Sequence, residues 1–258
     1  ENLVNNYGVK EIQIEDDNFT LKRHHAAAIC EEIIKRKIKL FWSLPNGVRI
    51  DKLDSELLSL MKKSGCYFMS LGIESANQRI LNMIKKHLNK DLVRNVVKMV
   101  KDSGIHGVGF FMIGFPTETK KEIMNTINFA CSLDLERANF HKAVPLPGTE
   151  LYDLWIEKYS KNQNIDWKIF CMDQFNADWA EVSPKELERL HKLAFFKFYF
   201  TKFRVIKFIF ALNVNQMFKF IKRLMSVLLT SKWYNRIFNK GARNIKFINP
   251  IERKIHKD

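Results

Sequence analysis

Short apolar stretches alternate with longer amphipathic stretches over residues 1 to 155. Five stretches rich in β-branched and aromatic residues have the length of β-strands, and they cover residues 11–14, 39–44, 67–73, 108–114 and 138–144. The segments between them place apolar residues at helical spacing, and these cover residues 24–37, 54–65, 91–104 and 118–134. The pattern therefore predicts a series of β-α units.

In a series of β-α units each helix returns the chain to the end of the sheet where the previous strand began, so the strands are parallel. The crossover connections between them are right-handed. The pattern leaves open whether the sheet is doubly wound or curled into a whole or partial barrel. In both folds ligands bind at the carboxyl ends of the strands. The segments there are EDDNFT (15–20), LPNGVR (44–49), GIES (72–75), GFPTET (114–119) and PLPGTE (145–150). Turns and helix caps explain any one of them, but together they predict a shared ligand site.

Three consecutive acids, Glu15, Asp16 and Asp17, follow the first predicted strand. Such acids are either solvated turn residues or ligands of a cationic group. Side chains alternate along a strand, so Glu15 and Asp17 share one face and Asp16 lies on the other. The three carboxylates therefore cannot all point into one site.

The segments IQIEDDNFT (12–20), GCYFMSLGIES (65–75), GFFMIGFPTET (109–119) and PLPGTELYD (145–153), in this order, resemble the radical S-adenosylmethionine (SAM) superfamily. They are most similar to the branch that often carries an N-terminal cobalamin-binding domain. The resemblance covers residues 1 to about 155. It implies an α/β fold, a partial (β/α) barrel of parallel strands without its first β-α unit, followed by an α-helical C-terminal extension.

The resemblance also implies cofactors and an activity. SAM and a 4Fe-4S cluster together generate a 5′-deoxyadenosyl radical that activates a C–H bond, and an electron donor such as flavodoxin or ferredoxin reduces the cluster. Cobalamin-dependent methylation is the leading reaction, although other members of the branch catalyse cyclisation or oxidation. The substrate is expected to be a small molecule, lipid-like or otherwise hydrophobic.

Ten residues are candidates for cofactor binding through this resemblance. Glu15, Asp16 and Asp17 face the amino group of SAM, with Asp16 and Asp17 preferred because they lie closest to the loop. The others are Arg49 for the SAM carboxylate, Glu74 and Ser75 for the ribose and methionine part, Gly114 and Pro116 for the loop past the adenine, and Val144 and Pro145 for the adenine side. Two alternatives stay open: Ser75 caps the helix after it, and Arg49 is a surface residue. At Thr117 the relatives more commonly have Gly.

The cluster of this superfamily is held by a CxxxCxxC loop, and the chain has no such motif. Its four cysteines are Cys30, Cys66, Cys131 and Cys171. The cluster ligands are therefore expected upstream of residue 1, the chain alone is expected to be inactive, and no metal ligand or catalytic residue is assigned within it. A relative that never had the cluster is the alternative. Cys66 is interpreted as a packed thiol.

The net charge of +15 is concentrated at the C-terminal end, because residues 191–258 carry sixteen Lys and Arg but two Asp and Glu. We expect three regions: the SAM-binding barrel (1–155), a connecting region at the substrate end (156–190) and a basic helical extension (191–258). Residues 213–230 have the pattern of an amphipathic helix.

Three alternatives stay open for this extension. It packs on the barrel, it binds an anionic membrane surface through residues 195–238, or it binds nucleic acid. Its many apolar residues favour lipid over nucleic acid. The protein is expected in the cytoplasm, with peripheral binding at the inner membrane surface as an option. A tRNA-modifying radical SAM enzyme and a non-catalytic membrane-surface module are the competing functions, and an upstream cysteine triad distinguishes the enzymes from the module.

Overall fold

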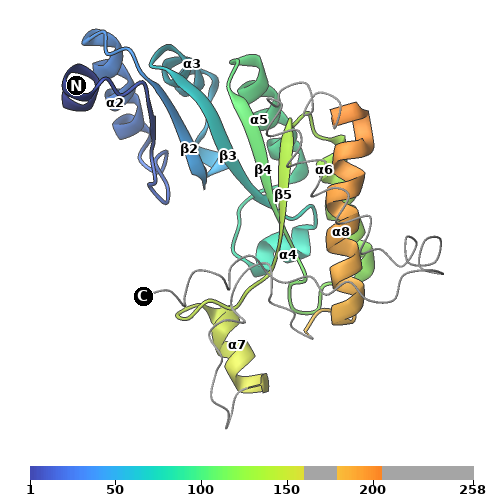
Figure 1. The fold of residues 1–258 in the computed structure, drawn as a ribbon. Helices are drawn as coiled ribbons and strands as arrows, with labels where there is room; N and C mark the ends of the chain where they lie inside the picture. The colour runs from blue at the N-terminus through green and yellow to red at the C-terminus, as the bar shows by residue number, and fades with distance from the viewer. Residues whose placement is uncertain (160–178, 205–258) are drawn as a thin grey trace, which may run out of the picture. The chain divides into compact units, whose positions relative to one another are not determined.

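The computed structural model describes residues 1–159 and 179–204, which contain one parallel sheet in the order β1-β2-β3-β4-β5 (Figure 1). The strands are β1 (Glu11–Gln13), β2 (Phe41–Val48), β3 (Cys66–Glu74), β4 (His106–Ile113) and β5 (Arg137–Lys142). All four strand pairings are parallel. Each strand lies beside the next one in the chain, without the reversal that marks a doubly wound sheet. The order therefore agrees with a partial barrel, and the predicted fold class is confirmed.

Helices precede, connect and follow the strands, and the longer connecting helices lie on one face of the sheet (Figure 1). The helices are α1 (Asn2–Tyr7), α2 (Arg23–Lys35), α3 (Ser55–Lys63), α4 (Gln78–Met83), α5 (Lys90–Asp102), α6 (Lys120–Ser132), α7 (Glu150–Tyr159) and α8 (Pro184–Phe200), with short 3-10 turns η1 (Ile50–Lys52) and η3 (Thr201–Phe203). Helix α8 packs against β5 and α6. Residues 1–204 form one compact unit.

Successive side chains along each strand point to opposite faces of the sheet, and the two faces differ in burial. Phe111 and Phe140 are fully buried, stack with ring centroids 5.3 Å apart, and belong to the main core with residues of α8. Phe110 and His141, one position away, lie outside that core and are only partly buried. We call the side opposite the covering helices the inner face. In a barrel this face lines the interior, where a substrate can be enclosed.

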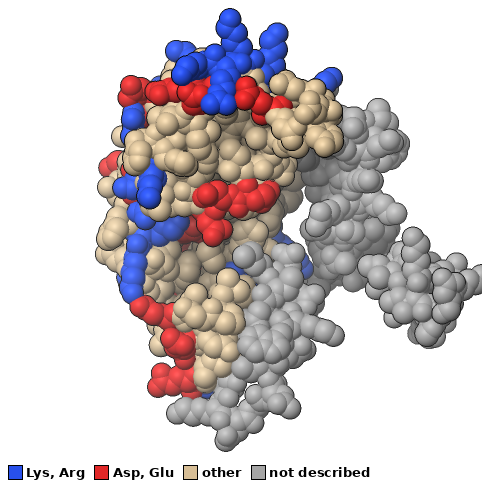
Figure 2. Space-filling model, turned by 90° about the vertical axis from the view of Figure 1, so that its left-hand side faces the viewer, with Lys and Arg blue, Asp and Glu red and all other residues tan. Residues whose placement is uncertain are grey.

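Several predictions from the sequence fall near or beyond the described residues. The proposed division between 190 and 191 stays a prediction, and α8 runs through this position. The amphipathic helix expected at 213–230 lies outside the described residues. Among the helices that the structure describes, none combines the length and apolar character needed to cross a membrane. Figure 2 shows acidic and basic side chains interspersed on one face of the described part.

The cysteines in the described ranges are packed thiols. Cys30, Cys66 and Cys131 are free and buried. Burial raises the pKa of Cys66 to about 12, so this thiol stays protonated at neutral pH. The interpretation of Cys66 as a packed residue is therefore confirmed.

Replacing Thr119 with alanine is expected to lower the free energy of unfolding by about 1 kcal/mol. Thr119 begins α6 with a capping box: its hydroxyl accepts from the Glu122 N–H (3.2 Å), and the Glu122 carboxylate accepts from the Thr119 N–H (2.9 Å). Urea denaturation measures the loss. Thr119→Ser retains the hydroxyl and serves as the control, so equal losses in both variants would contradict the capping role.

Candidate functional site

The acidic loop after β1 contains two carboxylates with no hydrogen-bond or ion-pair partner among the described residues. Asp16 differs, because its Oδ1 accepts from the Asn18 N–H (2.7 Å) and closes a local turn. The side chains of Glu15 and Asp17 are exposed and make no such bond within the described ranges. Ile14 packs on the helix-side core, so alternation places Glu15 on the inner face. Within the described ranges, Glu15 and Asp17 therefore have both carboxylate oxygens available to a ligand, whereas Asp16 has one.

The end of β3 holds an ion pair that the sequence did not indicate. Glu74 has a left-handed backbone (φ 66°), and its carboxylate lies 2.9 Å from the Lys86 ammonium. A Cβ on Gly72 would lie 3.1 Å from the Lys86 nitrogen and 3.2 Å from the Glu74 oxygen. The absence of a side chain at Gly72 therefore leaves room for this pair.

Ser75 is buried rather than turned toward the edge of the sheet. Its hydroxyl is 1% exposed and lies 3.2 Å from the Thr126 hydroxyl of α6, and it accepts from the Asn77 N–H (3.1 Å). These bonds tie the start of α4 to α6. The structure thus gives Ser75 a structural role near the helix start, and its contact with SAM stays a prediction.

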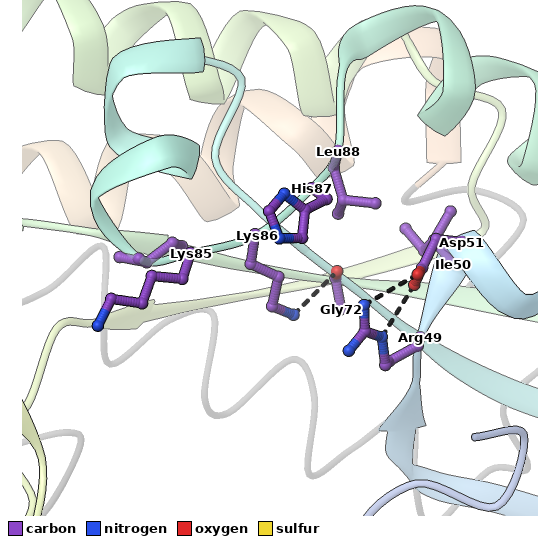
Figure 3. A pocket seen from close by; sticks show the side chains of 9 residues that line it. Arg49, Ile50, Asp51, Gly72, Lys85, Lys86, His87 and Leu88 are labelled. Carbon is purple, nitrogen blue, oxygen red and sulfur yellow. Dashed lines mark hydrogen bonds and ion pairs between the residues drawn. The ribbon is translucent and has the colours of Figure 1, made fainter.

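A small polar cavity of about 120 Å³ lies beside this ion pair (Figure 3). Arg49 and Asp51 line one side, where both guanidinium–carboxylate distances are 2.9 Å, and Lys86 and His87 line the other. The Arg49 hydrogen bond holds the pKa of Asp51 below its usual value. Asp51 occupies the Nε edge of Arg49, so a carboxylate ligand would bind the other edge of the guanidinium or displace Asp51.

The loop between β4 and α6 is organised by a buried acid, Glu118. One carboxylate oxygen accepts from the Gly114 N–H (2.6 Å) and the Phe115 N–H (3.1 Å), and the other oxygen has no partner among the residues that the structure describes. The side chain is 0% exposed, and burial raises its pKa to about 7. The sequence indicated only that a helix cap could account for the segment GFPTET, and the cap is Thr119.

Gly114 allows the loop to pass close to α8. Its backbone is left-handed (φ 80°), and a Cβ would lie 2.6 Å from a methyl group of Leu187 on α8. Its carbonyl accepts from the Trp179 indole N–H (2.7 Å). The glycine therefore permits close approach of α8, and its place beside the adenine of SAM stays a prediction.

Further bonds fix the rest of this loop. Thr117, with φ 58°, donates its N–H to the Trp179 carbonyl (2.8 Å), and Arg79 donates to the Thr117 carbonyl and hydroxyl (2.9 Å each). Arg79 also pairs with Glu122 at 2.7 Å. The loop conformation is thus held from both sides, even though Thr117 occupies a position suited to glycine.

The residues predicted to flank adenine line an apolar region. Val144 and Pro145 are buried, and Pro116 is half-buried. Val144 belongs to a second apolar cluster with Phe115, Trp155 and Trp179. The carboxyl edge therefore offers free carboxylates after β1 and an apolar wall after β4 and β5. These two regions fit the ammonium and the adenine of SAM.

The described residues do not fit an iron–sulfur cluster. Within residues 1–159 and 179–204, no group of three or more His, Cys, Asp or Glu side chains is arranged to hold a metal ion. Cys30, Cys66 and Cys131 come from α2, β3 and α6, and each is buried. No metal ligand is therefore assigned among these residues, and no step through a cluster is derived from this chain.

A parallel sheet in sequential order, with polar and apolar regions at its carboxyl edge, defines a partial (β/α)-barrel protein with a ligand site there. The sequence profile of the Radical SAM superfamily matches residues 1–130. The chain belongs to this superfamily, and the resemblance inferred from its loops is confirmed.

Similar proteins include methyltransferases. The chain is 33% identical over 204 residues to an uncharacterized methyltransferase of Pyrococcus horikoshii, covering 79% of the chain and 44% of the relative. It is 35% identical over 156 residues to cytidylyl-2-hydroxyethylphosphonate methyltransferase of Streptomyces wedmorensis, covering 58% of the chain and 29% of the relative. The matches thus span less than half the length of these relatives.

The fold is similar to that of a solved methyltransferase. The radical SAM methyltransferase TsrM from Kitasatospora setae superposes with a TM-score of 0.51 at 18% identity, covering 55% of the chain and 29% of that structure. At this identity the likeness concerns the fold alone.

Proposed function

We propose that the chain is the SAM-holding part of a radical SAM enzyme that transfers methyl groups. The observation that carries this proposal is the carboxyl edge of the sheet. There, the carboxylates of Glu15 and Asp17, which have no partner among the described residues, and the buried apolar cluster around Val144 suit the two ends of SAM. The methyltransferases among the relatives support the reaction class.

The proposed roles follow from the contacts of each residue. Glu15 and Asp17 accept charge-assisted hydrogen bonds from the SAM ammonium. Val144 and Pro145 pack against the adenine, and the braced loop at Pro116 holds its other side. These residues orient SAM and exclude water from it.

Glu74 and Arg49 can join this site without losing their present partners. Glu74 would accept from the ribose hydroxyls through the carboxylate oxygen that does not contact Lys86, and Arg49 would bind the SAM carboxylate through the guanidinium edge that does not contact Asp51. Bound SAM supplies, together with a reduced cluster, the radical that abstracts hydrogen from a substrate.

The other cofactors would be held outside the described residues. We place the cluster ligands upstream of residue 1, because the chain has no CxxxCxxC motif and its matches span less than half of the two methyltransferases. Cobalamin is the proposed methyl carrier, which rests on the resemblance to the cobalamin-associated branch. TsrM was solved with cobalamin and a [4Fe-4S] cluster bound. A flavodoxin- or ferredoxin-like protein would supply the electron.

The proposed partner of the C-terminal extension is a membrane surface, reached through residues 195–238 and suited to a lipid-like substrate. In the described part, Phe196 and Phe200 of α8 are 51% and 48% exposed, and their rings stack at 4.3 Å. Flotation with anionic phospholipid vesicles tests this. Phe196→Ser with Phe200→Ser should reduce recovery with vesicles, and unchanged recovery would remove these residues from the proposal.

Anaerobic reconstitution with iron and sulfide tests the enzymatic function. A form extended upstream through a cysteine triad should gain absorbance near 400 nm (roughly the thiolate-to-iron region) and release 5′-deoxyadenosine from SAM under dithionite. The 258-residue chain should do neither. Failure of the extended form would favour a non-catalytic module.

A further inference from the structure

Strand β5 carries three polar side chains on the inner face that have no hydrogen-bond or ion-pair partner within the described ranges. They are Arg137, Asn139 and His141, at alternate positions. The intervening residues, Ala138, Phe140 and Lys142, are 0%, 1% and 2% exposed. Arg137 is exposed and Asn139 and His141 are partly buried, so these side chains form a solvent-accessible polar surface that a ligand can reach.

Arg137 extends across the inner face. Its guanidinium carbon lies 5.3 Å from the centre of the Phe68 ring on β3, although β4 separates β3 from β5. The side chain of Arg137 therefore crosses β4 on the inner face. It passes over Val108, the β4 residue paired with Arg137 in the sheet, which is 4% exposed. Contact with an aromatic face leaves the N–H donors of the guanidinium edge free.

The nearby acids do not neutralise Arg137. Glu136 lies 2.8 Å from the His106 ring, and Glu11 accepts from the Tyr67 hydroxyl. No ion pair to Arg137 occurs among the described residues. A guanidinium that lies against an aromatic ring and has no counter-ion among the described residues favours an anionic ligand, which it can bind through two parallel hydrogen bonds.

Aromatic surfaces lie beside this cation. The Phe110 ring on β4 meets the His141 ring edge to face at 6.0 Å. Gly47 lies close to the Phe110 ring, because a Cβ on Gly47 would lie 3.8 Å from two carbons of that ring. From Arg137 to His141 the strand rises by roughly 13 Å toward the proposed SAM site. The inner face thus presents a cation at the amino end and flat apolar surface toward the carboxyl end.

We propose that Arg137, Asn139 and His141, with Phe68 and Phe110, form the substrate subsite, and that the substrate is an organic anion with a flat unsaturated body. Arg137 binds its acidic group, carboxylate or phosphate, and the rings of Phe68 and Phe110 pack against its body. The reacting carbon then lies toward the carboxyl edge, next to SAM. This inference rests on the proposed function, since it names the substrate class of the same barrel.

Binding of three naphthalene probes to the 258-residue chain tests the subsite. They are 2-naphthoate, 2-naphthyl phosphate and the neutral 2-naphthamide, titrated by calorimetry. We expect at least one charged probe to bind about 10-fold or more tightly than the amide, because a hydrogen bond to a charged group contributes about 1.5–3 kcal/mol. Whichever charged probe binds better identifies the acidic group. Arg137→Gln should remove the preference for charge, and Arg137→Lys should restore part of it.

Arg94→Gln is the matched control. Arg94 also lies over a phenylalanine, 4.9 Å from the centre of the Phe129 ring, but it belongs to α5 and donates to the Ser132 hydroxyl of α6 (3.2 Å). This variant should bind the probes like the wild-type chain, and SAM affinity should be unchanged in both glutamine variants.

Three results would overturn the subsite: equal binding of charged and neutral probes, no binding of any probe to the wild-type chain, or an Arg137→Gln variant that keeps the preference for charge. Failure of the proposed function gives a different result. In that case the chain binds no SAM, while its preference for the charged probe still depends on Arg137.

Discussion

Replacing Glu118 with alanine is expected to lower the free energy of unfolding by about 3–5 kcal/mol. The variant leaves the buried N–H groups of Gly114 and Phe115 without their acceptor, and it opens a cavity beneath the loop. Urea denaturation at pH 6 measures the effect. Glu181→Ala removes an exposed carboxylate close to the same loop and should cost little. Comparable losses in the two variants would contradict a structural role specific to Glu118.

Glu118 is also expected to make stability depend on pH. Its pKa is about 7 in the folded chain, compared with 4.5 for an ordinary glutamate, so folding favours the protonated form. The stabilisation is fully present below pH 4.5 and is lost as pH rises through 7, by on the order of 3 kcal/mol. Glu118→Gln keeps an acceptor for both N–H groups and should flatten this dependence. An unchanged pH profile in the glutamine variant would show that another group is responsible.

Replacing Glu15 with glutamine together with Asp17 with asparagine is expected to weaken SAM binding about 10- to 100-fold. The variant removes two negative charges from the loop after β1 and leaves its backbone intact. A hydrogen bond to a charged group contributes about 1.5–3 kcal/mol, which gives this range. Calorimetric titration at fixed ionic strength measures the affinity.

Asp16→Asn is the control for this loop. The asparagine oxygen can still accept from the Asn18 N–H, so the turn is retained while one charge is lost. SAM affinity should change little. Equal weakening by Asp16→Asn and by the double variant would support Asp16, which the sequence preferred together with Asp17. It would contradict the choice of Glu15 and Asp17 made from the structure.

The fold could be predicted from local patterns because strands and helices differ in the spacing of apolar residues. The five strands and four main helices lie where the pattern placed them, within a few residues. The pattern could not decide between a doubly wound sheet and a barrel, since both have the same alternation. Strand order decides it, and strand order depends on contacts between distant segments.

The site could be predicted as a set of loops but not in its contacts. The local turn at Asp16 and the pair between Arg49 and Asp51 join residues two positions apart, so both could have been inferred from the sequence. The pair between Glu74 and Lys86 depends on a left-handed residue that the sequence does not reveal.

Longer-range contacts were beyond the reach of the sequence. Gly114 is packed by Leu187, a residue of α8, and Arg137 reaches Phe68 only because of the register across three strands. Glu118 has the local sequence of a helix cap, and only the fold shows its carboxylate turned back to the Gly114 N–H. At these three residues the observed contacts differ most from what the sequence could predict.

A crystal structure of the chain with SAM bound would test the central claim most directly. The account predicts the ammonium of SAM within hydrogen-bond distance of Glu15 or Asp17 and the adenine against Val144 and Pro145, at the carboxyl edge of the sheet. SAM bound away from that edge, or bound there with both carboxylates still facing solvent, would contradict it.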